Sequence, residues 1–132
     1  HTAIRRGADT LYIAGVDDVW ERQDDLDAAL AGIPPGPAAT VLLAHEPDFA
    51  DEVAATGRIG LQLSGHSHGG QVRLPGIGAP VLPWLGRRYD MGLYLLGGMH
   101  LYVNRGIGMT APFVRFNCPP EITLITLTAP RT

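Results

Sequence analysis

Three short apolar segments, separated by stretches of a different character, dominate the first half of the chain. Residues 11–14, 40–44 and 60–64 have the length and apolar content of strands, and the uninterrupted run 40–44 is typical of a strand buried on both faces. Between them, residues 23–31 place apolar side chains on one face of a helix, and residues 48–56 begin a helix just after a proline. This alternation predicts an α/β fold built from β-α-β units.

The second half of the chain has a different pattern. Residues 93–96 and 99–103 flank Gly97-Gly98 and predict a β-hairpin, and the alternation over 121–127 predicts a C-terminal strand. Residues 73–91 form a long connection rich in proline and glycine, for which a lid or substrate-binding surface and a solvated loop are the two interpretations. A solvated loop is the favoured interpretation. The side chains that would form such a surface are Arg73, Trp84, Arg87, Arg88 and Tyr89.

The composition limits the classes of protein to which the chain can belong. With 132 residues, 45% of them hydrophobic, the chain is long enough for one domain with its own core. A net charge of -3 gives no reason to expect a nucleic-acid partner. The single cysteine, Cys118, excludes an internal disulfide and a cysteine-based zinc site, and we expect it to be a small structural residue. No apolar stretch is long enough to span a bilayer. Because the first residue is His1 rather than Met, we expect an N-terminal part to have been removed.

Histidines gather at the ends of two predicted strands. His66 and His68 lie in a Gly-His-Ser-His-Gly-Gly-Gln motif directly after the third apolar segment, and His45 ends the second. Imidazole is the commonest protein ligand for transition metals. Strands joined by one β-α-β crossover are parallel in nearly all cases, so both strands should end at the same sheet edge. The sequence therefore predicts a metal site formed by these three histidines, whereas His1 and His100 are expected to be structural.

Four short motifs occur in order along the chain. They are Gly15-Val16-Asp17-Asp18, Ala44-His45-Glu46-Pro47-Asp48, Gly65-His66-Ser67-His68-Gly69-Gly70-Gln71 and Asn104-Arg105-Gly106-Ile107-Gly108. Together with the closing run 120–124, they resemble the calcineurin-like metallophosphoesterase family. The resemblance is strongest to a bacterial branch that includes cell-envelope phosphoesterases and UDP-diacylglucosamine pyrophosphatases. It implies an αββα sandwich, of which this chain would be the C-terminal portion.

The resemblance also implies a chemistry for the histidines. His45 and His66 would bind one ion of a two-metal site, and His68 would bind the other. The ions would be divalent manganese, iron or zinc, and a hydroxide bridging them would attack phosphorus in line. The implied activity is hydrolysis of phosphomonoester, phosphodiester or diphosphate bonds in a phosphorylated small molecule or a lipid-linked substrate. The bacterial branch implies a location at the membrane or cell envelope.

Other residues near these motifs are candidates for supporting roles. Arg105 follows a strand in a glycine-framed turn, and its planar guanidinium suits phosphate oxygens. Asn104 and Asp18 are further candidates for substrate contact, although Asp18 could equally belong to a solvated turn that starts the following helix. The residues expected to support the metal ligands from behind are Asp17, Ser67 and Gln71.

Three motifs that intact members of the family carry are missing from the chain. There is no Asp-x-His, no Gly-Asp and no Gly-Asn-His sequence, and by the resemblance these supply the bridging aspartate and further ligands. We therefore expect residues 1–132 to be a single partial domain that is inactive alone and holds at most one ion weakly. Half a sandwich would leave apolar sheet surface uncovered, so we expect self-association or pairing with the missing N-terminal half. The alternative is a degenerate, non-catalytic domain for metal binding or assembly.

Overall fold

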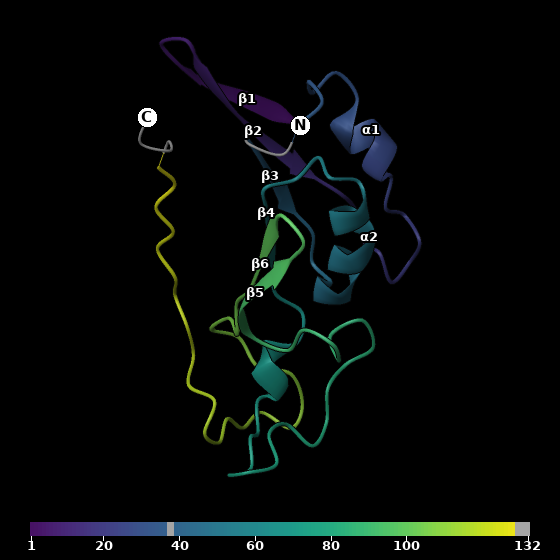
Figure 1. The fold of residues 1–132 in the computed structure, drawn as a ribbon. Helices are drawn as coiled ribbons and strands as arrows, with labels where there is room; N and C mark the ends of the chain where they lie inside the picture. The colour runs from purple at the N-terminus through teal and green to yellow at the C-terminus, as the bar shows by residue number, and fades with distance from the viewer. Residues whose placement is uncertain (37–38, 129–132) are drawn as a thin grey trace.

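Six strands form one mixed sheet with the order β1-β2-β3-β4-β6-β5 (Figure 1). The computed structural model describes residues 1–36 and 39–128 of the chain. Its strands are β1 (Thr2–Arg6), β2 (Asp9–Gly15), β3 (Thr40–Leu43), β4 (Leu61–Ser64), β5 (Gly92–Leu96) and β6 (Met99–Val103). Its helices are α1 (Leu26–Leu30) and α2 (Ala50–Ala55), with the 3-10 turns η1 (Pro47–Phe49) and η2 (His68–Gly70). The predicted α/β class is confirmed.

The four central strands run parallel to one another. Strand β2 pairs with β3, β3 with β4, and β4 with β6, whereas the outer strands β1 and β5 are antiparallel to their neighbours. Ala14, Leu42, Gln62 and Leu101 therefore lie in one row across the sheet. The predicted crossover through α2 and the predicted β5–β6 hairpin are both present. As a result, the carboxyl ends of four strands meet at one edge.

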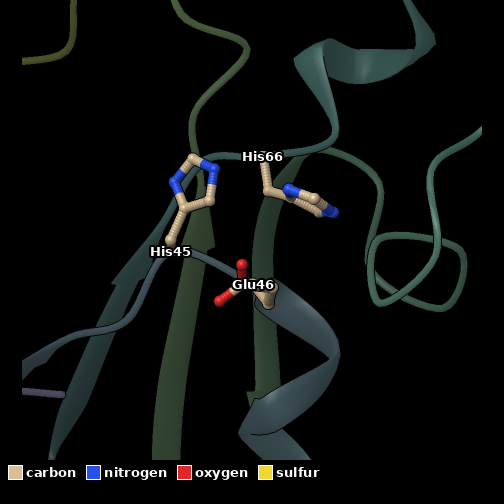
Figure 2. Close-up of side chains that lie close together, drawn as sticks. All are labelled: His45, Glu46 and His66. Atoms are coloured by element: carbon tan, nitrogen blue, oxygen red, sulfur yellow. The ribbon is translucent and has the colours of Figure 1, made fainter. Parts of the chain in front are cut away.

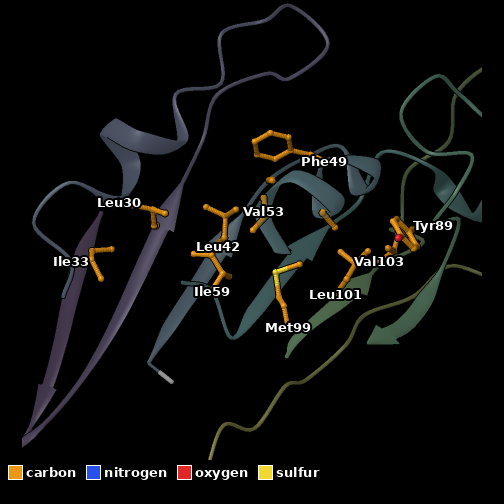
Figure 3. Close-up of a cluster of buried hydrophobic side chains, with 13 residues drawn as sticks. Leu30, Ile33, Leu42, Phe49, Val53, Ile59, Tyr89, Met99, Leu101 and Val103 are labelled. Carbon is orange, nitrogen blue, oxygen red and sulfur yellow. The ribbon is translucent and has the colours of Figure 1, made fainter. Parts of the chain in front are cut away.

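One face of the sheet carries the hydrophobic core beneath the two helices (Figure 3). Leu42 and Leu101 from the sheet are fully buried, and they share this core with Leu30 of α1 and Val53 of α2. Burial of each such side chain contributes about 1.5–3 kcal/mol to stability. This packing fixes β3, α2 and β4 as one unit and so fixes the turns that follow the two strands.

The opposite face of the sheet has no helix over it within the described ranges, since α1 and α2 both lie on the core side (Figure 1). The register places two rows of side chains on this face: Ile13, Val41, Leu61, His100 and Leu95 in one, and Gly15, Leu43, Leu63, Tyr102 and Leu93 in the other. Leu43, Leu93 and Leu95 expose 46%, 65% and 66% of their surface. Exposed leucines grouped on one sheet face are typical of a surface that meets another layer.

The predicted strand over 121–127 is wrong. The segment is extended, but it pairs with no strand in the part of the chain that the structure describes, and it runs on the side of the sheet away from the helices (Figure 1). Its alternating residues Ile122 and Leu124 expose 90% and 93% of their surface. Alternation predicts the two faces of a strand, but a strand also needs the backbone of a neighbour, and here none is present.

The first hairpin and the first helix also differ from the prediction. Strand β1 was missed because all five of its residues are exposed, so no apolar pattern marks it. It pairs with β2 through a turn in which Gly7 has a φ of 59°. Helix α1 is shorter than 23–31 because it begins only after Asp25, whose side chain accepts a hydrogen bond of 2.8 Å from the Ala28 amide.

Candidate metal centre

His45 and His66 lie side by side at the carboxyl edge of the parallel strands. His45 follows β3, His66 follows β4, and the Gly65 amide donates a hydrogen bond of 3.1 Å to the carbonyl oxygen of His45. The two imidazoles are edge-to-face, with their centroids 5.0 Å apart (Figure 2). The β-α-β crossover thus brings together two histidines that are 21 positions apart in the sequence (66 − 45). Their role as metal ligands stays a prediction.

The histidine motif folds as a turn with an unusual backbone. His66, His68 and Gln71 have φ values of 63°, 51° and 58°, in the left-handed region that is unfavourable for residues with a Cβ atom. Gly70 also has a positive φ, and a Cβ atom at this position would lie 2.3 Å from the Cβ of Ala79. Strained backbone of this kind, held by the surrounding fold, is concentrated at functional sites in proteins.

A hydrogen bond orients the imidazole of His66. Its Nε2 atom lies 2.7 Å from the carbonyl oxygen of Trp84, and a carbonyl oxygen only accepts, so Nε2 carries the hydrogen. In the neutral ring, Nδ1 then has a free lone pair, which is the state that binds a metal ion. The indole of Trp20 packs edge-on against the same ring, with the centroids 5.7 Å apart. Two loops therefore hold His66 in place.

Glu46 is a functional candidate that the sequence analysis missed. It directly follows His45 and is only 1% exposed. One ligand atom each from His45, Glu46 and His66 lie within 4.8 Å of one another, and Figure 2 shows the carboxylate beside the two rings. Imidazole and carboxylate are donors that zinc, iron and manganese accept in proteins. The available signal was a carboxylate adjacent to a histidine that ends a buried strand.

His68 lies apart from this group of donors. Its Nδ1 atom is 3.4 Å from the carbonyl oxygen of Gly108. Among the described residues, the group whose ligand atoms lie within 4.8 Å of one another consists of His45, Glu46 and His66, without His68. It nevertheless lines the same cavity as His45 and His66. The assignment of His68 to a second ion stays a prediction.

A cavity of about 530 Å³ opens beside the three histidines. Ser67, Gln71 and Thr110 add polar groups to its lining. The rest of the lining is mainly apolar and consists of Gly70, Val72, Pro80, Val81, Leu82, Pro83, Ala111 and Pro112. A cavity of this size and composition accommodates a small organic group beside a polar reacting centre.

Ser67 and Gln71 fasten the histidine turn to two other segments. The Ser67 hydroxyl donates a hydrogen bond of 2.6 Å to the Asp90 carbonyl oxygen and accepts one of 3.2 Å from the Gly69 amide. Gln71 donates to the Thr110 carbonyl oxygen at 3.1 Å and accepts from the Thr110 amide at 2.7 Å. The predicted role of both residues in supporting the metal ligands stays a prediction.

Arg105 and Asn104 follow β6 at the same sheet edge but lie outside the cavity lining. The Nε atom of Arg105 lies 2.6 Å from Oε2 of Glu121, so its guanidinium is held in an ion pair. Burial opposes ionisation of Glu121, but hydrogen bonds from Thr123, Tyr102 and Arg105 outweigh it and hold the pKa of this carboxyl at about 2. Asn104 donates to the Thr123 hydroxyl at 3.0 Å. Both candidates thus anchor the C-terminal segment.

Asp17 and Asp18 belong to the exposed turn that follows β2. Asp18 accepts a hydrogen bond of 2.9 Å from the Glu21 amide, which is the arrangement expected of a solvated turn. The next residue, Val19, donates its amide hydrogen to Glu46 at 3.3 Å. This turn therefore touches the candidate metal centre through its backbone.

The long connection 73–91 contains no strand or helix and is fastened to the rest of the fold. Arg88 forms an ion pair of 2.6 Å with Asp51 of α2, and Arg73 forms one of 2.6 Å with Asp90 within the connection itself. Tyr89 is 9% exposed and belongs to the core, so it is not part of a lid surface. Of the other residues proposed for such a surface, Trp84 and Arg87 are exposed.

Arg115 is a second residue that the sequence analysis missed. Its Nη2 atom donates to the carbonyl oxygens of Arg105 and Gly108 at 2.8 and 2.7 Å, and its Nη1 donates to those of Cys118 and His68 at 3.2 and 3.3 Å. One guanidinium thus joins the turn after β6 to the histidine turn. No sequence pattern marks this role, because the acceptors are backbone atoms of distant residues.

Comparison with known proteins identifies relatives over nearly the whole chain. An uncharacterized metallophosphoesterase, YkuE of Bacillus subtilis, is 40% identical over an alignment of 134 positions that covers 96% of this chain and 46% of the relative. The phosphodiesterase YaeI of Escherichia coli is 38% identical over 116 residues, covering 87% of this chain and 40% of the relative. A transmembrane protein with metallophosphoesterase domain from Bos taurus is 33% identical over 136 residues, covering 96% and 30%. No protein-family model and no solved structure matches the chain.

The chain spans less than half the length of these curated relatives. None of the helices in the described ranges is long and apolar enough to cross a membrane. Several relatives with the same family name match most of the chain, and the histidine-bearing sheet edge offers donors that suit a metal. The chain therefore belongs to the metallophosphoesterase family, as its motifs predicted.

Proposed function

We propose that the complete protein hydrolyses phosphomonoester, phosphodiester or diphosphate bonds at a two-metal centre, to which this chain contributes imidazole ligands. The observation that carries the proposal is the juxtaposition of His45 and His66, whose ring centroids are 5.0 Å apart, in a cavity that His68 also lines. The metallophosphoesterase and phosphodiesterase names of the relatives support the same class of reaction. Bound manganese, iron or zinc supplies water of lowered pKa and stabilises charge on phosphoryl oxygens.

The residues around the histidines suit this role. The Trp84 carbonyl fixes the ring of His66 with its Nδ1 lone pair free, and the left-handed turn holds the two histidines of the motif in place. Residues 80–83 contribute an apolar wall to the cavity. This apolar wall supports a substrate in which the phosphoryl group carries an apolar substituent, either a small-molecule ester or a lipid-linked one.

Turnover by the complete protein tests the proposal. With bis-p-nitrophenyl phosphate or p-nitrophenyl phosphate and added manganese, we expect His66→Ala and His45→Ala each to lower kcat/KM by about a hundredfold or more, since each removes a ligand. His1→Ala is the matched control, because His1 is exposed beside α1 and lies outside the cavity lining. Wild-type rates in both ligand variants would contradict the proposal. Metal binding without turnover would favour a non-catalytic domain instead.

The chain described here is proposed to be inactive on its own. Its described residues offer three imidazoles and one carboxylate at the site, which is enough for at most one weakly held ion. The same assay applied to the isolated 132-residue chain should therefore show no metal-dependent turnover. Turnover that depends on added manganese would contradict this.

The uncovered face of the sheet is proposed to pack against the rest of a metallophosphoesterase chain. The relatives are more than twice as long as the segment they share with this chain. They therefore contain enough additional polypeptide to form a second layer over this face. The exposed side chains of Leu93, Leu95, Ile122 and Leu124 would lie in that contact. Light scattering of the isolated chain tests the proposal. A chain that stays monomeric at high concentration would contradict it. A stable dimer would indicate that a second copy of the chain covers the face.

The complete protein is proposed to act at a membrane or the cell envelope. The support is the name of the bovine relative, a transmembrane protein with a metallophosphoesterase domain. Fractionation of cells that produce the tagged complete protein tests this, and recovery only from the soluble fraction would contradict it.

A further inference from the structure

We propose that Glu46 is a third ligand of the metal ion held by His45 and His66. The inference rests on the metal-binding part of the proposed function and is independent of turnover. Figure 2 shows the three side chains converging from the turn after β3 and the turn after β4.

Protein groups make few polar contacts with the side chain of Glu46. The side chain is 1% exposed, and a buried carboxylate is costly unless a cation or several hydrogen bonds offset the loss of water. The ion pairs of the described residues join Arg73, Arg88 and Arg105 to other acids, and none includes Glu46. Its hydrogen-bond donor in the described ranges is the Val19 amide, at 3.3 Å. This one long bond leaves the carboxyl group with capacity to accept a cation.

The spacing of the donors fits a metal ion better than a direct contact. The ligand atoms of His45, Glu46 and His66 lie within 4.8 Å of one another, yet in the described structure no hydrogen bond joins the carboxylate to either ring. Donors bound to one zinc ion at about 2.0–2.2 Å are roughly 3–4 Å apart. A small side-chain rotation would therefore place all three on one ion, whose charge would also offset that of the carboxylate.

The backbone holds Glu46 in this position. Its φ and ψ are −84° and 119°, and the following Pro47 favours this extended conformation. Pro47 is itself buried at the start of η1, so the chain cannot readily turn the side chain outward. The competing explanation is that Glu46 serves only to hold the Val19 amide, and an experiment must separate the two roles.

Glu46→Gln separates them, because glutamine keeps an acceptor for the Val19 amide but loses the charge. We expect the isolated chain to bind Zn²⁺ at least tenfold more weakly after this substitution, measured by competition with a chromophoric chelator. His45→Ala serves as the reference for loss of a ligand. Glu52→Gln is the matched control, since it removes the same charge from an exposed position on α2, and it should leave the affinity unchanged.

Thermal unfolding gives a second measurement of metal binding that needs no competing chelator. Without metal, Glu46→Gln should unfold at about the same temperature as the wild type, because glutamine has nearly the same size and keeps an acceptor for the Val19 amide. With excess Zn²⁺ the wild type should unfold at the higher temperature, since it gains more from binding. The proposal is overturned if Glu46→Gln binds Zn²⁺ as the wild type does, if it is destabilised equally with and without metal, or if the wild-type chain binds no Zn²⁺ at millimolar concentration.

Discussion

Gly70 occupies the position where the histidine turn is most crowded. A Cβ atom there would lie 2.3 Å from the Ala79 Cβ, and its φ of 77° is unfavourable for any other residue. We expect Gly70→Ala to lower the free energy of unfolding by about 2–4 kcal/mol, since the clash and the backbone strain act together. Urea denaturation followed by circular dichroism measures this change.

Gly98→Ala provides the comparison for that substitution. Gly98 has no neighbouring atom within 4 Å of an added Cβ and does not have a positive φ. It should change stability by less than about 1 kcal/mol. Equal losses of stability from the two substitutions would show that the close contact between Gly70 and Ala79 does not make glycine necessary in this turn.

At the residue scale, the sequence could predict the histidines but not their neighbours. His45 and His66 stand out because each follows an apolar strand, and the crossover rule then brings them together. Glu46 and Arg115 could not be found in the same way. The significance of Glu46 depends on its burial, and that of Arg115 depends on carbonyl groups that the fold gathers from distant turns.

The C-terminal segment is held to the sheet chiefly through Glu121. Its pKa of about 2 lies below the ordinary 4.5, so the charged form is favoured by folding and stabilises the protein above about pH 4.5. That contribution is lost as the pH falls from about 4.5 toward 2. We expect Glu121→Gln to lower stability by about 1 kcal/mol at pH 7 and by roughly half as much at pH 3, where the folded carboxyl is still largely ionised. Urea denaturation at the two pH values measures the difference, and a gap that does not depend on pH would refute the explanation.

At the element scale, the pattern of apolar residues predicted the elements correctly where a short crossover joins paired strands. Strands β3 and β4 with α2 between them follow directly from their apolar runs and turn residues. The segment 121–127 has an equally good alternation and still forms no strand, because pairing requires a partner edge that no local pattern supplies. Strand β1 shows the opposite case, since its partner β2 defines it and its own exposed residues do not.

At the scale of the whole molecule, the uncovered sheet face predicts how substitutions in β5 should affect self-association and stability. Leu93 and Leu95 expose 65% and 66% of their surface in the described fold. Replacing both with Gln should reduce self-association of the isolated chain with little change in its stability. In the complete protein the same change should be destabilising by about 1.5–3 kcal/mol per residue, if the face is covered there.

Size-exclusion chromatography with light scattering and thermal unfolding measure these two effects. Ile77→Gln is the control, because Ile77 is 74% exposed on the long connection rather than on the sheet. If the leucine variant and the control behave alike in both contexts, the sheet face is not a contact surface.

The strand order also sets a sequence of events during folding. Val41 pairs with Leu61 across a short crossover, whereas Leu61 pairs with His100 only after a much longer stretch of chain has closed. The entropy lost on closing a loop grows with the number of residues in it, so the β3–β4 pair should form before the β4–β6 pair. In pulsed hydrogen exchange during refolding, we expect amides of β3 to be protected before those of β6, and simultaneous protection would refute this. The paired imidazoles would then form before the cavity wall, so a metal ion present from the start of refolding could bind a partly folded chain.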